Sequence, residues 1–225
     1  MMFLEIFKIS RSVFMYLYNE IKHYFKAPRV HAVAPMTRLA CCLQILSNRM
    51  LNQNIIRQNV TICPQLSVSQ PVVSRSVEMV LNVFEKKLCP MWIKFPSTEM
   101  EISQCKKRFY DETGMVDVIG CVTCLNVSVL PFINNQDRFG NDNGVQSINV
   151  QLVCDYDMRI LSVDPRYPGG VPDTDIWSVS TERDELERIY RNGDKHVLLA
   201  HSGYPLEPWL ITPFVLDESS TQQQI

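Results

Sequence analysis

Two cysteines with the spacing of a metal or redox site stand in the stretch VIGCVTCLNVSV, residues 118–129. Cys121 and Cys124 are separated by two residues, as in zinc knuckles and thioredoxin-like redox pairs. A zinc site needs a second close pair of ligands, and the six other cysteines and the four histidines offer none. A redox pair needs a helix that starts after the second cysteine and lowers its pKa, and no such start follows Cys124. We therefore interpret the cysteines as small side chains packed within a strand.

The chain has 225 residues, of which 46% are hydrophobic, so it is long enough for one large or two small domains with a sizeable core. Its apolar N-terminus is interrupted by Glu5, Lys8 and Arg11, and no small-residue cleavage site follows, which argues against a signal peptide. No uninterrupted apolar run reaches the roughly 18 residues of a spanning helix. We expect a soluble intracellular protein with no membrane partner.

Charge is distributed unevenly along the chain. Residues 1–98 contain 12 Lys and Arg against 4 Asp and Glu, a balance of +8, whereas residues 99–225 contain 10 against 20, a balance of −10. Two regions of opposite charge suggest two functional parts, with the basic one suited to an anionic partner such as DNA. The alternative is that helical faces simply carry solvated lysines.

The first part has the pattern of helices. Apolar residues recur at helical spacing over residues 3–25 and 36–51, the second run with Thr37 as a candidate cap. Ser69 is placed to cap a further helix, because Pro71 falls in its first turn, where no intrahelical N–H is needed. The inner stripe of this helix is expected at Val73, Val77, Val80 and Leu81.

The outer face of this third helix suggests a helix-turn-helix over about residues 55–85. It would present four polar side chains to DNA, namely Ser69, Gln70, Ser74 and Arg75. Glu78 lies on the same face and would repel phosphate. Polar helix faces are common, so the alternative is an ordinary solvated helix face.

The second part changes to an alternation typical of strands. An apolar strand is expected over residues 116–132, a hairpin over 145–164 with its turn at Asp155–Met158, and a short strand at HVLLA, residues 196–200. The stretch YPGGVPDTD is expected to be a loop, and residues 179–192 form a charged helix capped by Ser180 or Thr181. Residues 217–225 form a polar tail. The order of elements predicts a mixed α/β module.

Five stretches, in their order along the chain, resemble one family. They are VSQPVVSRSV, WIKFP, VIGCVTCLNVSVLP, SINVQLVCD with YPGGVPDTDIW, and SGYPLEPWLITPF. They are similar to the PIF/Harbinger transposase superfamily and, within it, to the Harbinger transposase-derived nucleases, over residues 31–216. The resemblance implies a helical region with a helix-turn-helix (residues 1–98), followed by a ribonuclease-H-like DDE domain (residues 108–216). Such a domain holds Mg²⁺ or Mn²⁺ on acidic residues and hydrolyses DNA phosphodiester bonds.

The resemblance also places the catalytic acids, and this chain departs from the family pattern. The first family carboxylate falls at Thr123 and another falls at His201, whereas the acid of the PG-containing loop survives as Asp173. The last acid belongs on a helix beyond the TPF stretch, and we expect the chain to end at Ile225 before that helix. Asp173 would then be the one retained metal-binding acid, in a truncated and inactive domain with weakly bound or absent metal.

Each of these residues has a second interpretation. Asp173 either keeps a metal contact or caps a turn in a loop. His201 either joins a carboxylate in a zinc site or is a strand-end histidine without a role, since imidazole is a poor ligand for magnesium. Asp175 is a further nearby carboxylate to which the family pattern gives no role. A missing helix would expose apolar side chains, for which the candidates are Val197, Leu198, Leu199 and Trp209.

Three functions follow from these observations. The chain is a metal-dependent nuclease by lineage, a non-catalytic module that binds DNA or protein through residues 31–98, or a fragment without function. The residues at the catalytic positions favour the second function, the non-catalytic module. Metal ligands supply several kcal/mol of transition-state stabilisation, and this chain is expected to keep only one of the acids that would hold the metal. The resemblance further implies a Myb-like partner protein and a nuclear location, with the cytoplasm as the second location.

Overall fold

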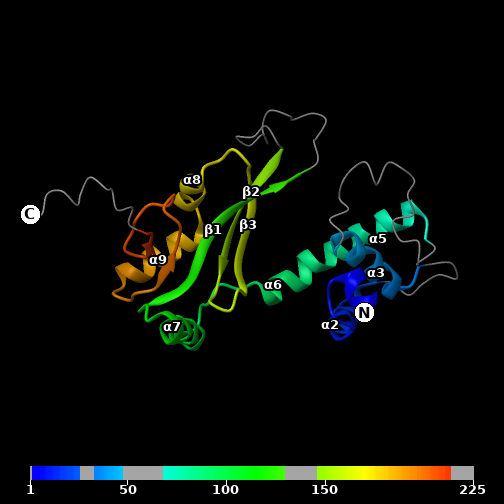
Figure 1. The fold of residues 1–225 in the computed structure, drawn as a ribbon, viewed down its shortest axis with the longest axis horizontal. Coiled ribbons are helices and arrows are strands. Elements are labelled where there is room, and N and C mark those ends of the chain that lie inside the picture. Colours follow the sequence, from blue (N-terminus) through cyan, green and yellow to red (C-terminus); the bar gives the residue numbers. More distant parts are fainter. Residues whose placement is uncertain (1, 26–32, 48–67, 130–145, 214–225) are drawn as a thin grey trace, which may run out of the picture. The chain divides into compact units, whose positions relative to one another are not determined.

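The computed structural model describes residues 2–25, 33–47, 68–129 and 146–213. The chain divides into two compact units, Met1–Trp92 and Ile93–Ile225, whose elements are labelled in Figure 1. The sequence analysis places the domain boundary at residue 98, a few residues later. Within the described ranges, no helix is both long and apolar enough to cross a membrane.

The described part of the first unit is helical. Its elements are α1 (Met2–Phe7), α2 (Arg11–Ile21), η1 (Lys22–Tyr24), α3 (Pro35–Ser47), α5 (Gln70–Val83), the π-helical segment η3 (Phe84–Leu88) and α6 (Cys89–Trp92). The run expected over residues 3–25 is not continuous, because Lys8 has a left-handed backbone with φ of 55°. Ser10 then caps α2 by accepting a hydrogen bond from the Val13 N–H at 3.2 Å.

Apolar stripes of these helices form the core of the first unit. Phe14 and Ile21 of α2 pack with Leu39 of α3, Val80 of α5 and Leu88 of η3. Burial of these stripes, rather than helix propensity alone, stabilises such short helices. The expectation that Thr37 caps α3 is wrong, because α3 already begins at Pro35.

Helix α5 follows the sequence expectation closely. Ser69 is its N-cap with an extended backbone, and Pro71 lies in its first turn. Val73 and Val80 are buried, but Leu81 is 39% exposed, so it lies outside the inner stripe predicted for it. The predicted DNA-facing residues Ser69, Ser74 and Arg75 are exposed and Gln70 is half-buried. The first helix of the predicted helix-turn-helix falls within residues 48–67, outside the described residues.

The second unit is a mixed α/β domain, as the alternation of its sequence predicts. Its elements are α7 (Glu99–Thr113), β1 (Val118–Ser128), β2 (Ser147–Cys154), β3 (Ile160–Pro168), α8 (Asp173–Ser178), α9 (Thr181–Arg191), β4 (Val197–Leu199) and β5 (Leu210–Ile211). The five strands form one sheet in the order β3-β2-β1-β4-β5. The pairs β1–β2 and β2–β3 are antiparallel, and β1–β4 and β4–β5 are parallel.

Local signals explain where the elements of this unit begin and end. Asp155 Oδ1 accepts from the Arg159 N–H at 2.8 Å, which closes the predicted hairpin turn. Ser180 caps α9, as expected, by accepting from the Arg183 N–H at 3.2 Å. The expectation of a loop at YPGGVPDTD is wrong in its last residues, because Asp173 already begins α8. Acidic side chains in a first helical turn favour such a start, since they face the positive end of the helix dipole.

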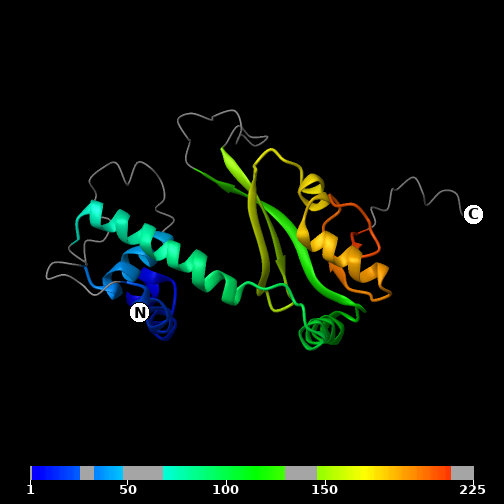
Figure 2. The ribbon, with the colours of Figure 1, turned by 180° about the vertical axis from the view of Figure 1, so that it is seen from behind.

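One face of the sheet is covered, and the other is partly open. Val122 and Val153 are buried against Trp177 of α8 and Leu186 of α9. Figures 1 and 2 show α8 and α9 on the β4–β5 side of the sheet and α7 at the end where β1 begins. The exposed apolar side chains of the opposite face are Leu125, Val127 and Val163. The expected exposure of Val197, Leu198 and Trp209 is contradicted, because all three side chains are buried, and Leu199 is half-buried.

Candidate functional site

Asp173 lies at the centre of a hydrogen-bonded network on the covered face of the sheet. Its Oδ1 accepts a hydrogen bond from Asn149 Nδ2 of β2 at 3.0 Å. Its Oδ2 lies 3.2 Å from Nε2 of His201, which follows β4. Asn149 is 2% exposed and also donates to the Val171 carbonyl at 2.9 Å, so it ties the loop before α8 to the sheet. The retained acid is therefore held by one residue of β2 and one of the segment that follows β4.

Both ring nitrogens of His201 are occupied. The backbone N–H of Gly203 donates to Nδ1 at 3.0 Å, so Nδ1 must be the unprotonated acceptor. Nε2 then carries the hydrogen and donates it to Asp173. In this tautomer the imidazole has no free lone pair for a metal ion, so a role for His201 as a metal ligand would require the Gly203 hydrogen bond to break or the proton to leave Nε2.

Cys124 and Tyr204 complete the network. Tyr204 Oη donates to Cys124 Sγ at 3.2 Å, and the Tyr204 ring meets the His201 ring edge to face at 4.9 Å. Burial raises the pKa of the Cys124 thiol to about 11; the Tyr204 hydrogen bond opposes this shift, and the Asp173 carboxylate adds to it. Burial, followed by the hydrogen bond to Cys124, also raises the pKa of Tyr204. At neutral pH the Cys124 thiol is therefore protonated.

The two cysteines flanking Thr123 serve different faces of β1. Successive side chains of a strand alternate between faces, so Cys124 faces the network whereas Thr123 and Cys121 point to the other side. Thr123 is exposed, and among the described residues its hydroxyl donates to the adjacent Cys124 carbonyl alone, at 3.4 Å. Because Cys121 and Cys124 point away from each other, they cannot bind one zinc ion. The structure brings Asp173 and His201 together but leaves Thr123 apart.

The network does not fit a divalent magnesium or manganese ion. These ions need several oxygen ligands, with carboxylates to neutralise their charge. Here one carboxylate accepts hydrogen bonds from an amide and an imidazole and lies beside a protonated thiol. Asp175 does not join it; its Oδ1 contacts the Thr174 hydroxyl at 3.4 Å. Across the described residues, no three His, Cys, Asp or Glu side chains are grouped closely enough to hold a metal ion.

A second set of contacts positions the segment that carries His201 and Tyr204. Glu207 accepts from the buried Trp177 Nε1 at 2.8 Å and from Arg183 Nη2 at 2.8 Å. The Arg183 guanidinium also lies over the Trp209 ring, 5.7 Å from its centroid. These contacts tie the segment after β4 to α8 and α9, and so fix its distance from Asp173.

The sequence analysis missed Asn149, Cys124 and Tyr204 as parts of this site. A signal for Asn149 is present, because Asn149 and Gln151 are polar residues at alternating positions of an otherwise apolar strand. Both are 2% exposed. Buried polar side chains in a strand generally have partners, and those partners mark a site. No local pattern reveals that Cys124 and Tyr204 meet, since they are 80 residues apart.

The raised pKa of Cys124 predicts slow alkylation. A rise of the Cys124 pKa from about 9 to about 11 lowers the fraction of thiolate at pH 8 by about a hundredfold. The more basic thiolate is intrinsically about tenfold more reactive, which offsets part of this loss. We expect Cys124 to react with iodoacetamide about tenfold more slowly than the exposed Cys89. Tandem mass spectrometry of the alkylated peptides measures both rates. Asp173→Asn should accelerate the reaction of Cys124, because it removes a nearby negative charge; equal rates for Cys124 and Cys89 would contradict the network.

Comparisons with known proteins point to one group. A family model described as DDE superfamily endonuclease matches residues 123–225, beginning at Thr123. "Putative nuclease HARBI1" of Homo sapiens is 27% identical over 157 residues, which cover 70% of this chain and 44% of the relative. The protein of the same name from Xenopus laevis is 27% identical over 192 residues, covering 85% of this chain and 52% of the relative.

A plant protein extends the similarity over almost the whole chain. "Protein ALP1-like" of Arabidopsis thaliana is 25% identical over 232 residues, which cover 94% of this chain and 54% of the relative. The chain thus spans about half the length of the curated relatives it matches. No solved structure matches it.

Proposed function

We propose that the chain is a member of the Harbinger transposase-derived group, to which its similarity to DDE superfamily endonucleases points, and that it binds DNA without cutting it by metal-dependent hydrolysis. Members of the DDE superfamily generally use divalent metals. The observation that carries the proposal is the Asp173 network, in which donors occupy the oxygens that a metal ion would need. The mixed sheet, with its order β3-β2-β1-β4-β5, supports the ribonuclease-H-like assignment.

Loss of the metal site has a large effect on catalysis. Two cations about 3.5–4 Å apart activate the water and stabilise the leaving oxygen in two-metal phosphodiester hydrolysis. Thr123 supplies a hydroxyl and His201 an imidazole at positions where the family pattern has carboxylates. Neither group balances the charge of a magnesium ion. The rival function, metal-dependent cleavage, would be established by purified protein that nicks supercoiled plasmid only when Mg²⁺ is added.

For the DNA contact we propose the exposed face of α5. Ser69, Ser74 and Arg75 are exposed there, and Gln70 is half-buried at the first position of the helix. The +8 balance of residues 1–98 supports an anionic partner. With a preceding helix within residues 55–67, α5 would be the recognition helix of a helix-turn-helix.

Arg75→Glu tests this contact. Reversing one charge at a phosphate or base contact should weaken binding of duplex DNA by about tenfold or more and lower the salt dependence of binding by about one unit. Fluorescence anisotropy with labelled duplexes measures both. Lys107→Glu, the same charge reversal on an exposed side chain of α7, is the matched control and should change binding little. Unaltered affinity of the Arg75 variant would exclude the α5 face.

Family membership also suggests where and with what the protein acts. We propose a nuclear location and a Myb-like partner protein, which would help to bring the chain to DNA. The positive net charge of residues 1–98 supports DNA as a ligand, and the negative net charge of residues 99–225 supports contacts with a protein. Fluorescence imaging of the tagged full chain, with and without a co-expressed Myb-like protein, tests the proposed location and the proposed partner. Retention of the chain in the cytoplasm under both conditions would contradict the two proposals.

A further inference from the structure

Two cysteines of the sheet lie directly opposite each other. In the register of β1 against β2, Cys121 is the Cα partner of Cys154. The side chains of directly opposite residues point to the same face of a sheet, with Cβ atoms about 4.5–5.5 Å apart. Both cysteines are half-buried free thiols, and they lie on the partly open face, the face of Thr123. They therefore form a facing pair that a small reagent in solution can reach.

The charge interaction between the two thiols agrees with this placement. Burial raises the pKa of the Cys121 thiol, and the nearby Cys154 raises it further. This second effect requires the two sulfur atoms to be close, because repulsion between thiolates falls with distance. Burial also raises the pKa of Cys105 in α7, but the other groups that shift it are charged residues and not the paired cysteines. Cys105 is therefore not a third member of the pair.

The hydrogen bonds of the ladder indicate how far apart the paired cysteines are. The Val129 N–H donates to the Gln146 carbonyl at 2.9 Å, which sets the alternation of hydrogen-bonded and non-hydrogen-bonded pairs along β1 and β2. By this alternation Cys121 and Cys154 are a hydrogen-bonded pair, with Cα atoms about 5.5 Å apart. A disulfide spans Cα separations of about 4.4–6.8 Å, but it needs Cβ atoms only about 3.5–4.5 Å apart. A disulfide here would therefore be strained, and strain makes the bond easier to reduce.

The pair lies where the ladder between β1 and β2 ends. Cys154 is the last residue of β2, and the pairing of β2 with β3 shifts its register between Val153 and Cys154. The pairing of β1 with β4 shifts its register between Val118 and Gly120, just before Cys121. Such irregularities interrupt the regular ladder and increase the local twist. The strain of a disulfide would thus fall on the end of the ladder, not on its middle.

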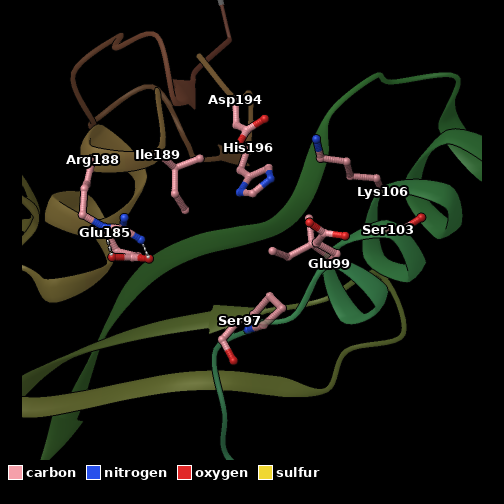
Figure 3. A pocket seen from close by; sticks show the side chains of 11 residues that line it. Ser97, Glu99, Ser103, Lys106, Glu185, Arg188, Ile189, Asp194 and His196 are labelled. Carbon is pink, nitrogen blue, oxygen red and sulfur yellow. Dashed lines mark hydrogen bonds and ion pairs between the residues drawn. The ribbon is translucent and has the colours of Figure 1, made fainter. Parts of the chain in front are cut away.

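Proximity, and not activation by a cation, distinguishes these two thiols. Burial raises the pKa of both, and among the described residues no basic group opposes the shift. Each basic side chain of α7 and α9 is paired with an acid instead. Figure 3 shows two of them at a cavity of about 490 Å³, where Arg188 is bonded to Glu185. The other, Lys106, donates to Asp117 Oδ1 at 2.9 Å.

We propose that Cys121 and Cys154 form a reversible disulfide when the protein meets a low-molecular-weight disulfide such as oxidised glutathione. One protein thiol loses its proton, and its thiolate attacks a sulfur of the oxidant, so that a mixed disulfide forms and one small thiolate leaves. The thiolate of the second cysteine then attacks the protein sulfur of the mixed disulfide and expels the other small thiolate. The two released thiolates take up the two protons. The protein thereby loses two electrons, and the oxidant becomes two thiol molecules.

The test treats the purified full chain with excess oxidised glutathione, blocks the remaining thiols with N-ethylmaleimide and identifies linked peptides by tandem mass spectrometry without reduction. We expect the Cys121–Cys154 link to be at least about tenfold more abundant than a link between any other two cysteines. Groups held face to face react as if at very high concentration, which distant thiols do not. An excess of reduced glutathione should then remove the link.

Two variants give a second readout. Cys121→Ser and Cys154→Ser each leave one cysteine without a facing thiol, so that cysteine should retain glutathione at least about tenfold more than in the unchanged chain. Cys105→Ser, at another half-buried cysteine of the same unit, is the matched control and should leave the link unchanged. The link itself is measured in the unchanged chain, so the test does not depend on how well a variant folds.

Three results would overturn the proposal. In the first, the unchanged chain keeps Cys121 and Cys154 as thiols under excess oxidant, or carries glutathione on each of them separately. In the second, another cysteine replaces either partner in the link. In the third, the link forms but resists excess reduced glutathione, which would make it a permanent crosslink and not a reversible site.

Discussion

Trp177→Ala is expected to destabilise the second unit by about 3–5 kcal/mol, enough to leave much of it unfolded at 37 °C. Trp177 is fully buried between the sheet and α9, and its indole N–H donates to Glu207 at 2.8 Å. The substitution leaves a cavity and removes one of the donors that hold the segment carrying His201. Urea denaturation followed by circular dichroism measures the free energy of unfolding.

Two further variants separate packing from hydrogen bonding at this position. Trp177→Phe keeps most of the volume and loses the N–H, so it should cost clearly less than the alanine variant. Trp92→Ala removes the same side chain where it is 46% exposed and stacked on Tyr16, and should cost less than about 1 kcal/mol. If the Trp177 and Trp92 variants were equally stable, the core assignment of the second unit would be wrong.

Gly120→Ala is expected to have the next largest effect. A Cβ atom built at Gly120 would lie 2.8 Å from the backbone carbonyl oxygen of Cys154 and 3.2 Å from Leu198 Cδ2. The backbone of a paired central strand cannot move aside cheaply, so overpacking should cost about 1–3 kcal/mol, which exceeds the roughly 0.4–1 kcal/mol gained from a stiffer unfolded chain. The free energy of unfolding from urea melts tests this prediction.

Gly114→Ala is the informative comparison for this variant. Gly114 has a φ of 73°, and a Cβ atom there would meet nothing within 4 Å. The cost at Gly114 should therefore come from backbone strain alone and be relieved in Gly114→Asn, because asparagine tolerates left-handed backbone. No such relief is expected for Gly120→Asn. A stable Gly120→Ala protein would mean that β1 and β2 are less closely packed than the structure indicates.

Local sequence patterns predict the strands and capped helices of this protein well. The alternating apolar residues of β1 and β2, the turn at Asp155 and the cap at Ser180 are all confirmed. The apolar periodicity of the sequence does not indicate α7. Its signal lies at its ends, where Thr98 and Glu101 form a capping box and Gly114 ends the helix in a left-handed conformation.

The candidate site is less predictable, because its contacts join distant parts of the chain. Family resemblance selected Asp173 and His201, and their side chains do meet. The resemblance gives no reason to expect that Cys124, rather than Thr123, shares their face of the sheet. This follows from the register of β1 against β2, which tertiary pairing determines. Asn149 likewise gains its role only when the loop before α8 folds back over β2.

Isothermal titration calorimetry with MgCl₂ and MnCl₂ on the purified full chain tests the central claim most directly. We expect no saturable binding of either ion at neutral pH, and the same absence of a binding heat for Asp173→Asn. One carboxylate, already hydrogen-bonded by Asn149 and His201, offers a hydrated divalent ion too little charge to displace its water. Two tightly bound ions per chain, lost in Asp173→Asn, would contradict the account and restore metal-dependent DNA cleavage as the function.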